Sequence, residues 1–245
     1  GGAAGSPFVT PPERGPGRRG GQGPPPAGRW GGGAGGGGPP PAVLAAAPAI
    51  AEHGGDTLVM FADTPLTRPE TLRALTGTLQ EGANVAVLGF EPADPTGYGR
   101  VLTDARGDVA AIREHKDASA AERGVGLCNA GAMAFRVPTL VELLRRIGNK
   151  NASGEYYLTD AVALARADDL RVRAVVGSIE DAMGVNSRAQ LAEAEAAFQS
   201  RARRRAMDEG ATLIAPETVW FSYDTRIGQD VLIEPNVFFG PGVTV

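Results

Sequence analysis

The chain has 245 residues and a formal net charge of −4 at pH 7, from 24 basic and 28 acidic side chains. This balance, without a stripe of basic residues, argues against nucleic-acid binding. The sequence has no apolar run of about 18 residues and no signal-peptide core, so no membrane contact is expected. The lone cysteine, Cys128, excludes an internal disulfide and favours a cytoplasmic protein.

Residues 1–41 differ in composition from the rest of the chain. They hold 16 of the 35 glycines and 10 of the 19 prolines, and Val9 is their only aliphatic side chain larger than alanine. Such a segment cannot bury enough apolar surface to offset its chain entropy. It is therefore expected to be a disordered low-complexity tail or, the reading we favour, the product of a shifted reading frame or a misplaced start.

Residues 42–187 alternate between helical and strand patterns, which predicts an α/β domain with a mainly parallel, Rossmann-like sheet. The predicted helices are 42–51, 69–80, 139–147 and 157–167, and the predicted strands are 57–61, 85–90, 100–102, 109–112, 129–135 and 172–176. Ligands of such sheets bind at the carboxyl ends of the strands. Asp63 and Asn129 are expected at two of these ends.

Residues 188–209 predict a long helix, because alanine, glutamate, arginine and glutamine are strong helix formers. Gly210 ends this linker helix, which we bound at 188–210. Beyond it, from 211 to 245, a period of six appears. The recurring positions are Ala215, Phe221, Ile227, Ile233, Phe239 and Val245. A six-residue period indicates a parallel β-helix, here only its first coils.

Two sequence strings suggest a binding site. The string Asp-Pro-Thr-Gly-Tyr-Gly-Arg covers 94–100, and its glycines allow a tight turn or a close approach of backbone to a ligand. The string Gly-Glu-Tyr-Tyr-Leu-Thr-Asp covers 154–160 and is expected to open a helix. Taken alone, the first string is more often an ordinary turn.

In combination, these strings, the Phe61-Ala62-Asp63 strand end, the 128–131 strand edge and the Gly-Val-Asn turn at 184–186 resemble one family. It is the bacterial bifunctional family of N-acetylglucosamine-1-phosphate uridyltransferase and glucosamine-1-phosphate acetyltransferase. The resemblance runs from about residue 42 to residue 245. It implies a nucleotidyltransferase domain over 42–187, a linker helix and the start of a left-handed parallel β-helix.

The resemblance implies an Mg²⁺ site made by Asp63 and Asn186. Magnesium prefers hard oxygen ligands and usually takes only one or two from protein. From the residues alone, each side chain could instead be a helix cap.

The same resemblance implies a substrate site for UTP and N-acetylglucosamine 1-phosphate. Phe61 and Ala62 flank it, and Gly99, Glu114 and Asn129 would hold the sugar nucleotide. Their alternative readings are a turn glycine, a surface acid and a strand-edge amide. Secondary candidates are Glu155 and Tyr157, on the N-acetyl side.

The chain departs from the family pattern in places. The family usually has glycine where Ala62 stands and often tyrosine where Phe61 stands. Residues 1–41 contain no phosphate-binding loop of the family, so little turnover is expected, and acetyl transfer is not expected from 211–245. The family assembles as a homotrimer through its β-helix. Five hexads make too short a β-helix to expect a stable trimer from this chain.

Two alternatives to the uridyltransferase interpretation are a non-catalytic assembly module and a nucleotidyltransferase for another sugar.

Overall fold

A computed structural model describes residues 43–137 and 139–245. The predictions for 1–41 lie outside these residues. The elements are α2 (Ala47–His53), β1 (Thr57–Val59), α3 (Pro69–Gln80), β2 (Val85–Phe90), β3 (Arg100–Thr103), β4 (Val109–Arg113), α4 (Ala120–Arg123), β5 (Cys128–Phe135), α5 (Thr139–Arg146), α6 (Asp160–Ala167), β6 (Val172–Val176), the 3₁₀ turn η1 (Glu180–Ala182), α7 (Arg188–Asp208), β7 (Thr212–Leu213), the 3₁₀ turn η2 (Pro216–Thr218) and β8 (Leu232–Ile233). No helix in the described part combines the length and apolar character needed to cross a bilayer.

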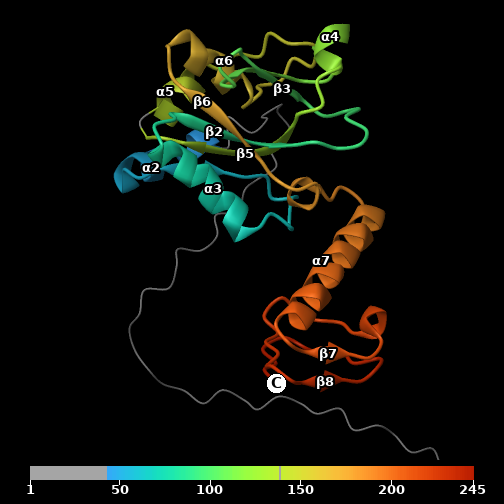
Figure 1. The fold of residues 1–245 in the computed structure, drawn as a ribbon. Helices are drawn as coiled ribbons and strands as arrows, with labels where there is room; N and C mark the ends of the chain where they lie inside the picture. The colour runs from blue at the N-terminus through green and yellow to red at the C-terminus, as the bar shows by residue number, and fades with distance from the viewer. Residues whose placement is uncertain (1–42, 138) are drawn as a thin grey trace, which may run out of the picture. The chain divides into compact units, whose positions relative to one another are not determined.

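The main sheet has the order β4-β3-β5-β2-β6, with β1 also pairing to β5 (Figure 1). Among the described strands of this sheet, only the β2–β6 pair is parallel. The pairs of β5 with β1, β2 and β3, and of β3 with β4, are antiparallel. The prediction of a mainly parallel sheet is therefore wrong. Between β2 and β5 the chain forms a hairpin and the four-residue helix α4, not the long crossover helix that a parallel pair requires.

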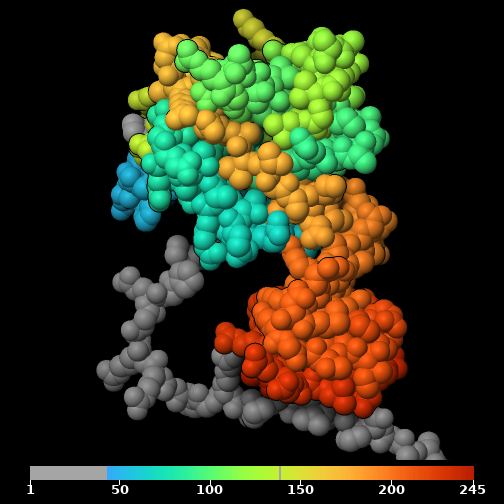
Figure 2. Space-filling view, viewed as in Figure 1, coloured from blue at the N-terminus to red at the C-terminus, as the bar shows by residue number. Residues whose placement is uncertain are grey.

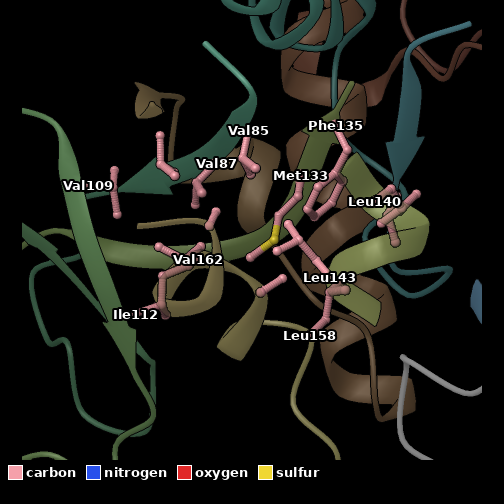
Figure 3. Packing of buried hydrophobic residues seen from close by; sticks show 14 of the residues in the cluster. Val85, Val87, Val109, Ile112, Met133, Phe135, Leu140, Leu143, Leu158 and Val162 are labelled. Atoms are coloured by element: carbon pink, nitrogen blue, oxygen red, sulfur yellow. The ribbon is translucent and has the colours of Figure 1, made fainter. Parts of the chain in front are cut away.

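Helices cover both faces of this sheet, because side chains alternate along each strand. Val85 and Val87 of β2 face α5 and α6, whereas Ala86 and Leu88 face α3. Figure 3 shows the larger layer, where Met133 of β5 packs among side chains of α5 and α6. The sheet is thus the middle layer of three.

Some predicted elements have different bounds. The first strand ends at Val59 instead of residue 61, and Met60 and Phe61 are each 38% exposed. The helix predicted from 157 begins at Asp160, so the tyrosine string precedes it. The hairpin, β6 and α7 lie within a residue or two of their predicted positions.

Residues 211–245 wind so that positions about three hexads apart lie side by side. β7 pairs in parallel with β8, and parallel bridges join Trp220 to Phe238 and Arg226 to Thr244, each 18 positions apart. The buried hexad side chains Phe221, Ile233 and Phe239 form a separate cluster with Ala206, Ala211, Leu213 and Val219. Residues 211–245 appear as a continuous mass of atoms in Figure 2. The predicted six-residue period therefore coincides with parallel pairing between successive turns.

Candidate functional site

A pocket of about 380 Å³ lies where loops gather at one end of the main sheet. This volume is within the usual range for small-molecule sites. Of the nine residues named from the sequence, those that line the pocket are Phe61, Asp63, Gly99, Glu114, Asn129, Tyr157 and Asn186. Ala62 and Glu155 do not line it, and both are exposed.

Antiparallel pairing places Asn129 at the pocket. We expected it at the carboxyl end of a strand, but it is the second residue of β5. Because β5 runs against β2, Asn129 lies beside Gly89, near the end of β2. Its backbone N–H donates to the carbonyl of Gly99 at 2.8 Å, and its side-chain Oδ1 accepts from the N–H of Gly131 at 3.2 Å. The backbone of Asn129 is therefore tied to the 97–99 turn, and its side-chain oxygen is held by its own strand.

Glu114 follows β4 and is half-buried against the 97–99 turn. Its Oε1 accepts a hydrogen bond from Thr159 at 3.0 Å. A methyl group at Gly99 would meet the Glu114 carboxylate oxygens at 3.2 and 3.3 Å, so the glycine allows this approach. Burial raises the pKa of the Glu114 carboxyl; the Thr159 hydrogen bond opposes the rise, and the charges of Asp117 and Asp160 add to it. Glu114 is thus an oriented acceptor beside the turn.

Asp63 and Asn186 lie on two loops that are far apart in the sequence. We call residues 60–68 the aspartate loop and residues 177–187 the asparagine loop. The N–H of Val185 donates to the carbonyl of Asp63 at 2.8 Å, so the loops touch beside both side chains.

The sequence left open whether Asp63 and Asn186 are helix caps, and in the structure neither side chain caps a helix. The N-cap of α3 is Arg68, and that of α7 is Ser187, whose hydroxyl accepts from the N–H of Gln190. Within the described residues, the carboxylate of Asp63 and the side-chain amide of Asn186 have no hydrogen-bond partner. A carboxylate and an amide oxygen at one pocket fit the donor set of an Mg²⁺ ion that keeps several waters. The described part holds no cluster of three or more histidine, cysteine or acidic side chains suited to a metal.

Gly131 is a pocket residue to which the sequence analysis gave no role. Its φ is +86°, and a methyl group there would lie 2.4 Å from two ring carbons of Phe61. The glycine thus allows the aromatic ring to lie directly against β5. A glycine inside a strand pattern was the available signal for such a close approach.

Arg68 and Asp181 were also missed. Burial alone would raise the pKa of the Asp181 carboxyl, but hydrogen bonds from Arg68 and Ser178 outweigh it and hold this pKa well below its usual range. Neither residue lines the pocket. Their separation in the sequence exceeds 100 positions, so no local pattern pointed to their contact.

The charged side chains that line the described pocket are all acidic. Its charged lining residues in the described part of the chain are Asp63 and Glu114, with no lysine or arginine. A polyphosphate would therefore meet no cationic side chain among these residues.

Comparison with curated proteins gives strong matches. The chain is 62% identical over 198 residues to the bifunctional protein GlmU of Azorhizobium caulinodans, a match that covers 80% of this chain. It is 59% identical over 200 residues to the GlmU of Xanthobacter autotrophicus, which covers 81%. Over its matched residues, this chain is thus similar to GlmU proteins. The chain spans 44% of the length of each of these GlmU proteins.

Comparison with family models and with solved structures gives information about the fold. No model of a known protein family matches this chain. Among solved structures, UDP-glucose pyrophosphorylase in complex with UDP-glucose superposes with a TM-score of 0.52 and 19% identity, over 68% of this chain and 63% of that one. The fold of this chain therefore resembles that of UDP-glucose pyrophosphorylase.

Proposed function

We propose that the pocket serves uridylyl transfer, in which N-acetylglucosamine 1-phosphate and UTP give UDP-N-acetylglucosamine and pyrophosphate. Such a product is a precursor for peptidoglycan and lipopolysaccharide. The observation that carries the proposal is the meeting, at one pocket, of the unpaired Asp63 and Asn186 with the oriented Glu114 and Asn129. The similarity to GlmU proteins supports the choice of substrates.

In this reaction, an oxygen of the sugar phosphate attacks the α-phosphorus of UTP, and the bond from that phosphorus to the pyrophosphate oxygen breaks. Negative charge is redistributed over phosphate oxygens, so catalysis depends on positioning and electrostatic stabilisation. In our proposal, the side-chain oxygens of Asp63 and Asn186 would hold Mg²⁺. The bound metal would supply charge neutralisation at the phosphates.

The sugar side of the proposed site is built from strands and a turn. Glu114 accepts hydrogen bonds from sugar hydroxyls. The Asn129 side-chain oxygen accepts from the N–H of Gly131, and its N–H₂ group donates to the sugar nucleotide. Gly99 lets the backbone approach the nucleotide. Tyr157, which lines the pocket, is assigned to the N-acetyl group. Glu155 lies outside the pocket lining, and we assign it no contact.

A binding experiment tests this assignment without requiring turnover. Because no cationic side chain lines the described pocket, we expect weak UTP binding and little turnover by this chain. Calorimetric titration with UDP-N-acetylglucosamine should show Mg²⁺-dependent binding that Asp63→Ala abolishes. UDP-glucose, which lacks the N-acetyl group, should bind more weakly. Equal binding of the two sugar nucleotides would favour a nucleotidyltransferase for another sugar, and binding of neither would contradict the proposal.

A second proposal concerns domain organisation. We propose a nucleotidyltransferase domain over 42–187, a linker helix over 188–210 and the beginning of a left-handed parallel β-helix over 211–245. The 18-position offset of the parallel bridges supports the last part, because three hexads make one three-sided coil. A non-catalytic role in assembly would require this coil to form a trimer. Light scattering would then give a molar mass three times that of one chain.

A further inference from the structure

The proposed metal site raises a structural question. Asp63 and Asn186 must present their oxygens at a fixed separation, yet both lie on loops. Close to the two side chains, a hydrogen bond from Val185 to the carbonyl of Asp63 joins the loops. A single backbone bond does not fix the orientation of two loops, so the source of their rigidity must lie further away.

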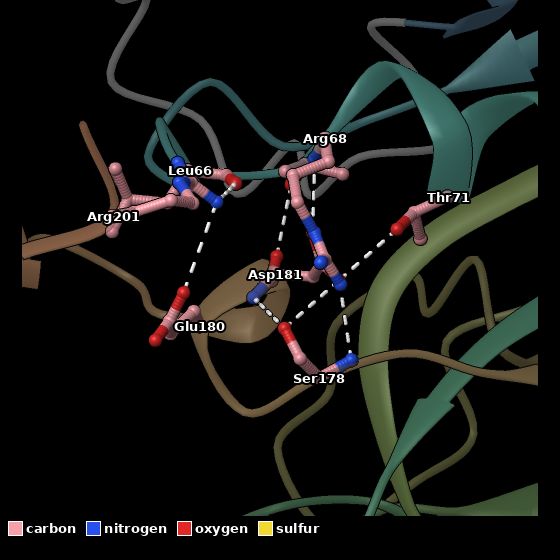
Figure 4. A network of polar contacts seen from close by, with 8 residues as sticks. Leu66, Arg68, Thr71, Ser178, Glu180, Asp181 and Arg201 are labelled. Carbon is pink, nitrogen blue, oxygen red and sulfur yellow. Dashed lines mark hydrogen bonds and ion pairs between the residues drawn. The ribbon is translucent and has the colours of Figure 1, made fainter. Parts of the chain in front are cut away.

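Both loops are anchored at a single carboxylate, that of Asp181. Oδ1 accepts from the backbone N–H of Arg68 at 2.9 Å and from its Nε at 3.1 Å. Oδ2 accepts from Arg68 Nη2 at 2.7 Å, Thr71 Oγ1 at 3.0 Å, and the N–H and hydroxyl of Ser178 at 3.1 and 3.0 Å. Figure 4 shows these groups converging; we call Arg68, Thr71, Ser178 and Asp181 the Asp181 cluster.

In the sequence, the two central residues of the Asp181 cluster are equally far from the two proposed ligands. Arg68 follows Asp63 by five positions, and Asp181 precedes Asn186 by five. The Asp181 side chain has no exposed surface, whereas that of Arg68 is 41% exposed. The carbonyl of Asp181 also accepts from Thr67 Oγ1 at 2.9 Å, which ties η1 to the aspartate loop a second time.

The chemistry of the cluster requires these residue types. A guanidinium donates two hydrogen bonds to a carboxylate in a fixed plane, whereas a lysine ammonium is a point charge without that geometry. Of the six donors around Asp181, three belong to Arg68, which lies at the end of the other loop. Arg201 of α7 bridges the same two loops, at the carbonyl of Leu66 (3.3 Å) and the carboxylate of Glu180 (3.8 Å).

We propose that Arg68 and Asp181 are positioning residues that set the separation of Asp63 and Asn186, and with it the affinity of the site for a divalent cation. This inference rests on the proposed metal site. Groups that orient metal ligands from outside the coordination shell commonly change metal affinity by about 10- to 100-fold when they are replaced.

The test measures Mn²⁺ binding to the full chain with UDP-N-acetylglucosamine present, from the electron paramagnetic resonance signal of free Mn²⁺. Arg68→Lys keeps the charge and the backbone N–H but loses the planar pair of donors, and it should weaken Mn²⁺ binding by about 10-fold or more. Thr71→Val removes one of the six donors and should have a smaller effect. If Asp181→Asn does not fold, these two variants still decide the question.

The matched control is Arg166→Lys. Arg166 forms a comparable ion pair at 2.8 Å with Asp104, remote in sequence from both loops and outside the pocket lining. It should lower the melting temperature and leave Mn²⁺ affinity unchanged. If Asp63→Ala loses Mn²⁺ but Arg68→Lys binds as the wild type does, the positioning role is wrong. If Asp63→Ala itself binds Mn²⁺ normally, the proposed metal site fails, and this inference fails with it.

Discussion

The pocket has two walls that are built differently. On the proposed sugar wall, formed by the 97–99 turn, Glu114 and Asn129, the Glu114 carboxylate and the Asn129 amide oxygen already have hydrogen-bond partners within the chain. On the proposed metal wall, formed by the aspartate and asparagine loops, the side chains of Asp63 and Asn186 have no hydrogen-bond partner in the described residues. The sugar wall rests on strands, and the metal wall rests on the Asp181 cluster.

This difference illustrates two ways of fixing binding side chains before the ligand arrives. Side chains that are hydrogen-bonded before the ligand arrives are oriented at no further cost, as on the sugar wall. Oxygen ligands of a metal must remain free to coordinate, so their rigidity has to come from groups behind them. The two walls should therefore respond differently to substitution.

The largest effect is expected behind the metal wall. Asp181→Asn removes a buried charge that six donors surround, and it should lower the free energy of unfolding by about 3–5 kcal/mol, because two or more hydrogen bonds to a charged acceptor are lost or weakened. The depressed pKa of Asp181 stabilises the fold above the unfolded value of about 3.9, and this stabilisation is lost as the pH falls. Urea unfolding should thus show a smaller loss at pH 3 than at pH 7. The exposed Asp56→Asn is the control; an equal loss there would contradict the assignment.

Next comes the metal wall itself. Asp63→Ala should weaken Mn²⁺ binding by on the order of 100-fold or more, above the effect of residues outside the coordination shell. Asn186→Ala should act on the same ion, so the double variant should be less than additive. Because neither side chain has a partner in the described residues, melting temperatures should stay near the wild-type value. A lower melting temperature with unchanged Mn²⁺ binding would make Asp63 a structural residue only.

A moderate effect is expected where the walls meet. Gly131→Ala places a methyl group against the Phe61 ring at a positive φ, and should cost about 1–3 kcal/mol of stability. Removing the ring with Phe61→Ala should relieve the clash but not the backbone strain. The cost of Gly131→Ala, measured by urea unfolding, should therefore shrink in the Phe61→Ala background. Additive losses would show that the ring does not press on Gly131.

The smallest effect is expected on the sugar wall. The folded state disfavours the ionised Glu114, so this group's destabilising contribution grows as the pH rises from the unfolded pKa, about 4.3, through the raised folded one. Glu114→Gln removes this contribution and should gain stability relative to the wild type from pH 4 to pH 7. Its UDP-N-acetylglucosamine affinity should fall, while the dependence on Mg²⁺ stays nearly the same. A stability difference that is flat with pH would contradict the raised pKa.

The sequence predicted local features well and long-range ones poorly. The β3–β4 hairpin, β6 and α7 were placed correctly because glycine punctuation and helix propensity act over a few neighbouring residues. The sheet direction was wrong, since helix–strand alternation does not reveal which helices cross over. The β1 strand was predicted too long because its apolar run continues into the exposed Met60 and Phe61.

The candidate site shows the same limit. The resemblance to a known family pointed to Asp63, Glu114 and Asn186 as site residues. The fold brings all three to one pocket. No pattern in the sequence pointed to Arg68 and Asp181, because their contact spans 113 positions and involves common surface residue types. Such pairs become visible only when tertiary structure brings the loops together.

Gln199, buried in α7, has a consequence for the coil that follows. Its amide accepts from the backbone N–H of Phe221 and donates to the carbonyl of the same residue, both at 2.8 Å. Trp220, by contrast, pairs with the next turn of the coil, through Val237 and Phe239. The side chain of Gln199 thus occupies the hydrogen-bonding groups that a foreign strand would need at Phe221. At Phe221, the start of the coil therefore presents no free backbone N–H or carbonyl to a second chain.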